Sequence, residues 1–199
     1  MGQGPRYRVV FRRRRQKRTD YKMRKAMIVS KAPRLVVRGT LAHMNLQIAE
    51  ALLEGDKMLV SANSKRLVSF GWKAPSGNIP AAYLTGYLLG KKALAAGLEE
   101  AVLDVGLTST TTGARLFAAL KGVIDAGLVV PHSENILPLD QRIKGEHIAQ
   151  YATKIHELDS ALYDRMYSQY LSKGLRPEEL PEHFTGIKAA IDQAFKEGN

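Results

Sequence analysis

The spacing of hydrophobic residues predicts strands in the segment between residues 34 and 62. Residues 34–39 (RLVVRG) form a short β-branched run that is typical of a strand. Residues 44–53 fit a second strand that ends in the turn at 54–56, and residues 57–62 fit a third. Because the two turns follow each other closely, we expect a three-stranded antiparallel meander.

Helical spacing takes over after a polar loop. Leucine and tyrosine recur at helical intervals over residues 79–98, and Lys91 and Lys92 are the only charged residues there, so we expect a largely buried helix. Residues 101–105 (AVLDV) form a continuous apolar run around one aspartate, which is the pattern of a central buried strand. Residues 114–126 predict an amphipathic helix. A meander followed by helix, strand and helix favours an α/β sandwich with a mixed sheet.

The last third of the chain has the pattern of helices joined by connectors. Residues 138–145 predict a connector, 146–171 one long helix, and 175–183, which holds two prolines, a rigid spacer. Thr185 is expected to cap a final helix. The apolar face of that helix consists of Ile187, Ile191, Ala194 and Phe195.

Charge adds a separate N-terminal region to this picture. Residues 1–38 contain 14 Lys and Arg against one acid, Asp20, whereas the other 161 residues contain 16 against 18. The near-neutral body therefore carries a strongly cationic arm. Blocks of like charge stay extended until a partner neutralises them. We expect no regular structure before a short basic helix over residues 20–30, with Thr19 as its N-cap and Asp20 in its first turn.

These patterns divide the chain into three predicted parts. Residues 1–33 form a basic arm with a short helix, residues 34–137 form the α/β core, and residues 138–199 form a C-terminal helical appendage.

The chemistry of the arm points to nucleic acid. Guanidinium and ammonium groups replace counterions on phosphates, aromatic rings stack on exposed bases, and arginine, which outnumbers lysine ten to four here, makes bidentate phosphate contacts. A solvated tail or a nuclear localisation signal would need no interleaved aromatic residues and only about five to eight basic ones. RNA is favoured over DNA because no helix-turn-helix, zinc-finger or zipper pattern is present. The candidate contacts in this region are Arg6, Tyr7, Arg8, Phe11, Arg12, Arg13, Arg14, Arg15, Lys17, Arg18, Tyr21, Lys22, Arg24 and Lys25.

Other chemistries find little support. There is no cysteine, which suits a reducing compartment, and the five histidines are dispersed without metal-ligand spacing. No nucleophile motif and no paired carboxylates can be identified, so we predict no catalytic residue, no metal site and no cofactor. No run of 18 apolar residues occurs, so we expect neither a membrane span nor a membrane partner.

One motif leaves an enzymatic alternative open. Asp104-Val-Gly-Leu-Thr-Ser-Thr fits D-x-G-x-T-x-T and resembles the phosphate-binding turn of the actin and sugar-kinase ATPases. The chain would then be a nucleotide-dependent enzyme using Asp104. We favour the structural reading, in which Asp104 ends a buried strand and caps the turn, because no second, similar domain is present.

Short segments spread along the chain resemble the archaeal-type large-subunit ribosomal protein that carries 5S ribosomal RNA, the universal family numbered eighteen. They are Pro5-Arg-Tyr-Arg, Arg12 to Arg15, Tyr21 with Arg24, Arg34-Leu-Val-Val-Arg, Phe70-Gly-Trp-Lys, Gly77-Asn, Ala81-Ala-Tyr, Gly86, Leu103-Asp with Gly106, Thr111-Thr-Gly, Leu120-Lys-Gly, Asp125, Gly127, Pro131-His-Ser, Gly145-Glu-His-Ile and Pro181-Glu-His-Phe.

The resemblance implies a three-layer α/β/α sandwich and a non-enzymatic role. It implies that the protein binds 5S rRNA and attaches it to the large-subunit 23S-type rRNA at the central protuberance, beside neighbouring ribosomal proteins in the cytoplasmic ribosome. By this resemblance, the RNA-binding arm of the family corresponds to Arg6 to Lys25 in this chain. It implies further RNA contacts at Arg34, Arg38, Trp72 and Lys73. A general nucleic-acid chaperone with a nonspecific tail is the remaining alternative.

Overall fold

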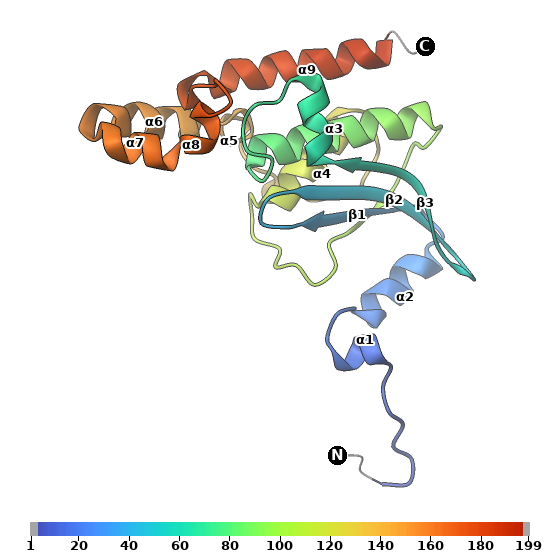
Figure 1. Cartoon of the computed structure of the whole chain (residues 1–199). Coiled ribbons are helices and arrows are strands. Elements are labelled where there is room, and N and C mark those ends of the chain that lie inside the picture. Colours follow the sequence, from blue (N-terminus) through green and yellow to red (C-terminus); the bar gives the residue numbers. More distant parts are fainter. Residues whose placement is uncertain (1–3, 197–199) are drawn as a thin grey trace.

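A mixed four-stranded sheet lies at the centre of the molecule. The computed structural model describes residues 4–196, and its sheet has the order β3-β2-β1-β4 (Figure 1). The first three strands form the predicted antiparallel meander, and β4 pairs in parallel with β1. The strands are β1 (Arg34–Gly39), β2 (Met44–Leu52), β3 (Gly55–Asn63) and β4 (Val102–Asp104).

Strand β4 lies at the edge of this sheet, so the prediction of a central strand was wrong. It pairs with β1 alone, and beyond it only an isolated bridge joins Glu100 to Val129 among residues 4–196. Ala101 and Asp104 are buried, whereas Val102 and Leu103 are half-buried. The apolar run indicates that the strand is buried, but it does not indicate whether the strand has one neighbour in the sheet or two.

Two helices cover one face of the sheet. α3 (Ile79–Ala95) begins after Asn78, whose side chain accepts a hydrogen bond from the Ala81 amide at 2.8 Å, and it packs on α4 (Arg115–Asp125). The backbones of the two helices come into close contact at Gly86. A Cβ at Gly86 would lie 2.0 Å from the Ala119 carbonyl oxygen, so only glycine permits this approach. The predicted α/β sandwich with a mixed sheet is confirmed.

The C-terminal helices differ from the predicted pattern in two places. Asp159 adopts an extended conformation and caps α7, accepting from the Leu162 amide at 3.0 Å, so the single helix expected over 146–171 is broken there. The last helix begins at Leu180 rather than after a Thr185 cap, because Pro181 is tolerated in a first helical turn. The elements are η2 (Glu134–Ile136), α5 (Asp140–Lys144), α6 (Glu146–Leu158), α7 (Ser160–Met166), α8 (Ser168–Leu171), η3 (Pro177–Glu179) and α9 (Leu180–Lys196).

Helix α9 packs on the core through its predicted apolar face. Ile187 and Ile191 are buried. The Tyr87 hydroxyl of α3 donates to Asp192 at 2.6 Å. Of the part of the chain that the structure describes, no helix is long and apolar enough to cross a membrane.

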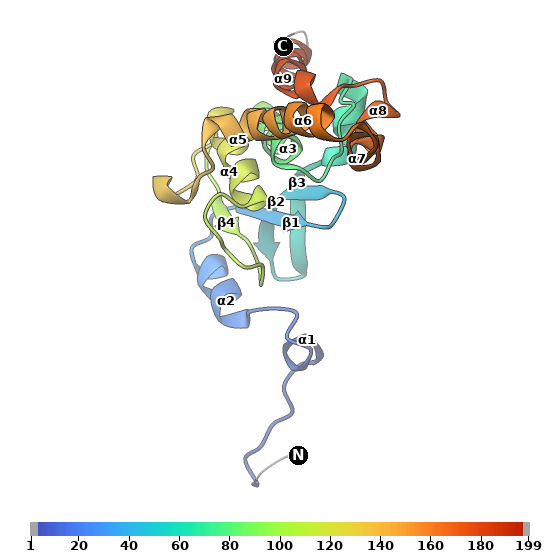
Figure 2. The same cartoon turned by 90° about the vertical axis from the view of Figure 1, so that its left-hand side faces the viewer.

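The arm extends away from the body on the side of the sheet opposite α3 and α4 (Figures 1 and 2). It contains α1 (Arg12–Arg15), a single turn in a region where no helix was expected, and α2 (Tyr21–Val29). The N-cap of α2 is Asp20, not Thr19 as predicted: its Oδ1 accepts from the Lys22 and Met23 amides. A carboxylate is well suited to this position, where it faces the positive end of the helix dipole.

Candidate nucleic-acid interface

The arm presents its cations to solvent. Within residues 4–31, no side chain of α1 or α2 is buried, and α1 consists of four consecutive arginines. Four guanidinium groups on one helical turn repel one another in the isolated protein. A polyanion would remove this repulsion, so the geometry of α1 suits a phosphate backbone.

Apolar side chains of the arm are exposed as well. Phe11 is 81% exposed, Tyr7 52% and Tyr21 36%. These rings are accessible for stacking, which is sequence-tolerant and contributes about 1–3 kcal/mol per base. Further exposed apolar residues of the arm are Val9, Val10, Met23, Ile28 and Val29.

One ion pair fastens α2 to the body. The Arg24 guanidinium donates to both carboxylate oxygens of Asp56, at 2.8 and 3.0 Å, and Asp56 also lies 2.7 Å from Arg34. Partial burial alone would raise the pKa of Asp56, but Arg34 and then Arg24 outweigh it, so the pKa lies below its ordinary value. No sequence pattern marked Asp56, which shares its turn with a second acid, Glu54.

Asp104 joins two of the predicted RNA contacts beneath the arm. Its carboxylate lies 3.1 Å from Arg34 Nη1 and 2.8 Å from Arg38 Nη2, and its backbone carbonyl accepts from Arg38 at 2.6 Å. The Arg34 side chain is 2% exposed, whereas the Arg38 side chain is 43% exposed. Arg34 is therefore a buried structural cation in this fold, and Arg38 retains an accessible edge.

Trp72 is a core residue rather than a surface platform. It is 2% exposed, follows the helix η1 (Ser64–Phe70), and stacks on His183 with 5.2 Å between ring centroids. The Lys73 amide donates to His183 Nε2 at 3.1 Å, while the Lys73 side chain is exposed. Burial, and then the charge of Lys73, lowers the pKa of His183. In this loop, Lys73 is accessible to RNA and the Trp72 ring is not.

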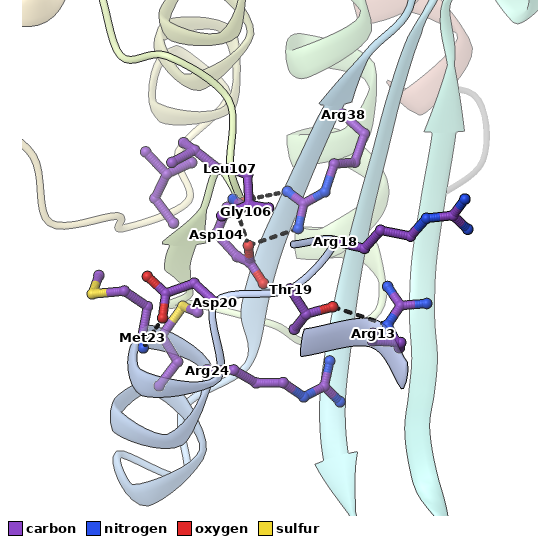
Figure 3. A pocket seen from close by; sticks show the side chains of 13 residues that line it. Arg13, Arg18, Thr19, Asp20, Met23, Arg24, Arg38, Asp104, Gly106 and Leu107 are labelled. Atoms are coloured by element: carbon purple, nitrogen blue, oxygen red, sulfur yellow. Dashed lines mark hydrogen bonds and ion pairs between the residues drawn. The ribbon is translucent and has the colours of Figure 1, made fainter. Parts of the chain in front are cut away.

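A groove separates the arm from the body (Figure 3). It measures about 190 Å³, below the roughly 300–1,000 Å³ of small-molecule sites. Arg13, Arg18 and Met23 line it from the arm, and Arg38 and Leu107 from the body. The Arg13 Nε donates to Thr19 Oγ1 at 2.9 Å, which holds α1 against the turn that precedes α2.

The Asp104 turn lacks the geometry of a nucleotide site. Oδ1 accepts from the Gly106 amide at 2.9 Å, as expected of a residue that caps its own turn, and both carboxylate oxygens are paired with arginine. Nowhere in residues 4–196 do three or more His, Cys, Asp or Glu side chains gather in a way that could hold a metal ion. Asp104 therefore serves the scaffold.

Comparison with known proteins agrees with this geometry. The family described as "Ribosomal large subunit proteins 60S L5, and 50S L18" matches residues 5–101 and 97–133. The large ribosomal subunit protein uL18 of Aeropyrum pernix is 51% identical over 197 residues, covering 98% of this chain and 92% of the relative. The chain thus belongs to the family of ribosomal large-subunit proteins 60S L5 and 50S L18, and it is a structural constituent of the ribosome rather than an enzyme.

Proposed function

We propose that this protein binds 5S rRNA and attaches it to the large-subunit rRNA at the central protuberance. The observation that carries the proposal is the arm, whose exposed basic and aromatic side chains project from a near-neutral body. Family membership supports RNA as the partner. The proposed direct contacts are Arg6, Tyr7, Arg8, Phe11, Arg12, Arg13, Arg14, Arg15, Lys17, Arg18, Tyr21, Lys22 and Lys25.

The remaining predicted residues take different roles in this proposal. Arg24 and Arg38 share their charge between an aspartate and solvent, so each can offer one edge to a phosphate. Arg34 holds Asp56 and Asp104 beneath the arm. Trp72 supports the loop that presents Lys73.

Equilibrium binding to 5S rRNA over a salt series tests the proposal. If about six to ten phosphates are neutralised, affinity should fall about 10³- to 10⁵-fold between 50 and 200 mM salt. Unlabelled 5S rRNA should compete far better than an unrelated RNA of equal length. Equal competition by the two RNAs would contradict the proposal and favour a general nucleic-acid chaperone.

A further inference from the structure

The loop between β4 and α4 carries five consecutive hydroxyl residues, Thr108 to Thr112, all of them exposed. Across the described chain, no hydrogen bond from any of these five side chains to another protein group is present. Each hydroxyl can both donate and accept, so the loop offers a dense set of hydrogen-bonding groups to a ligand.

Both ends of the loop are fixed to the body. At its start, the Gly106 amide donates to Asp104 at 2.9 Å, and at its end the Gly113 amide donates to the Ile136 carbonyl at 3.0 Å. Gly106 has a φ of +64°, and a Cβ there would lie 2.9 Å from Arg38 Cζ. The loop therefore begins in direct contact with the Arg38 guanidinium, and its position relative to that cation is set by the scaffold.

The loop and the arm lie on the same side of the sheet. In both views the segment after β4 descends from the sheet towards the side occupied by α1 and α2 (Figures 1 and 2). Leu107 of the loop lines the same groove as Arg13 and Arg18 of the arm, with Arg38 pointing in towards Asp104 (Figure 3). The groove thus has a cationic wall on the arm and a second wall that ends at Leu107, directly before the hydroxyl residues. The next two, Thr108 and Ser109, line a neighbouring hollow together with Arg115.

We propose that residues 107–112 form the second wall of an RNA-binding groove and hold the sugar–phosphate backbone of one RNA strand against the arm. Arginine side chains of the first wall neutralise phosphates, while serine and threonine hydroxyls bond phosphate and ribose oxygens. This inference rests on the proposed function and names a contact outside the basic residues. It also gives a role to the hydroxyl-rich turn that does not fit a nucleotide site.

Two variants of the full-length protein test this inference against 5S rRNA. In the first, residues 108–112 are all replaced by alanine. Loss of two or three hydroxyl hydrogen bonds should weaken binding about tenfold. The slope of log affinity against log salt should stay unchanged, because hydroxyl contacts release no counterions.

The second variant is Thr110→Glu, and its matched control is Gln169→Glu on the exposed surface of α8. Both changes add one negative charge, but only the first places it on the proposed RNA-binding loop, so Thr110→Glu should weaken binding at least about tenfold more than the control at low salt. Thermal unfolding and circular dichroism check that each variant retains the fold, which the exposure of these side chains favours.

Each outcome decides between the two proposals. If the unaltered protein shows no preference for 5S rRNA, the proposed function fails and this inference falls with it. If the unaltered protein binds but both loop variants match it, the loop contact is wrong while the proposed function stands. A smaller salt slope in the alanine variant would also overturn the inference, since the substitution would then act by weakening the phosphate contacts of the arm.

Discussion

The arm and the body of this protein use arginine in opposite ways. Within the described residues, α1 and α2 bury no side chain, whereas α3 buries twelve of its seventeen. Arg12 to Arg15 stand in solvent, while Arg34 is nearly enclosed between Asp56 and Asp104. The same residue type is thus available to a ligand in the arm, whereas in the body it serves as a structural cation.

This comparison predicts that affinity and stability separate along the chain. Arm residues make few internal contacts, so their loss should change RNA binding and leave the free energy of unfolding almost unchanged. Loss of a buried ionic residue should lower the free energy of unfolding and leave RNA binding almost unchanged. Substitutions in the arm and in the buried ionic network measure the two effects separately.

Among the substitutions, replacing Arg12 to Arg15 together by alanine should have the largest effect on binding. If each arginine neutralises one phosphate, the salt slope should fall by roughly 3 units and affinity for 5S rRNA by about 10²- to 10³-fold. The melting temperature should stay within about 2 °C, because these side chains are exposed.

The control removes four exposed basic side chains from the body, at Lys154, Arg165, Lys173 and Arg176. It changes net charge equally, so net charge alone would predict the same loss of affinity. An equal loss in the control would show that long-range attraction, rather than contact by α1, dominates binding.

Arg34→Met should instead reduce stability. Removing one member of a buried ion pair leaves its partners partly unpaired, so we expect the free energy of unfolding to fall by about 3 kcal/mol. Below the melting temperature, affinity for 5S rRNA should change less than about threefold, because the side chain is buried. Urea titration measures the free energy of unfolding, and binding isotherms measure the affinity. A large loss of affinity at unchanged stability would mean that Arg34 contacts the RNA directly.

Asp56→Asn should have the smallest effect and an unexpected sign. The substitution raises net charge, which alone would strengthen RNA binding, but it also loosens α2 by weakening the Arg24 contact, so we expect affinity to fall about threefold. Glu54→Gln, the same charge change on an exposed neighbour, is the control and should not weaken binding. Tighter binding by both variants would mean that the ion pair does not position the arm.

The pH dependence of Asp56→Asn tests the contacts of Asp56 with Arg34 and Arg24 together. Because the pKa of Asp56 is lowered in the folded protein, its stabilisation is present above the unfolded pKa of about 4 and is lost as pH falls through the lower folded value. Asp56 is partly exposed and Arg34 keeps its second partner, Asp104, so the difference in unfolding free energy should be under about 1 kcal/mol at pH 7. The difference should vanish at strongly acidic pH, as measured by urea unfolding at several pH values.

The sequence was sufficient for the features that depend on local patterns. Alternation and turns predicted the meander, and helical spacing predicted α3 and α4, since each needs only neighbours within a few residues. The burial of Arg34 was not predictable, because its partner Asp104 lies 70 positions away. The burial of Trp72 was not predictable for the same reason, because it depends on contact with His183 on the distant helix α9.

Charge counting located the candidate interface, but it could not separate ligand-binding cations from structural ones. Arg24, Arg34 and Arg38 belong to the same basic run as Arg12 to Arg15, and only the fold brings them to Asp56 and Asp104. The hydroxyl loop was visible as a motif, yet its position beside the arm depends on the packing of β4 against β1.

Removal of residues 1–33 measures how much of the affinity for RNA depends on the arm. Affinity for 5S rRNA and thermal unfolding are measured on the shortened and the full-length protein under the same salt conditions. We predict that residues 34–199 fold with a melting temperature within a few degrees of the full chain and bind 5S rRNA at least about a thousandfold more weakly. Equal affinity of the two proteins, with the fold intact, would contradict the assignment of RNA binding to the arm.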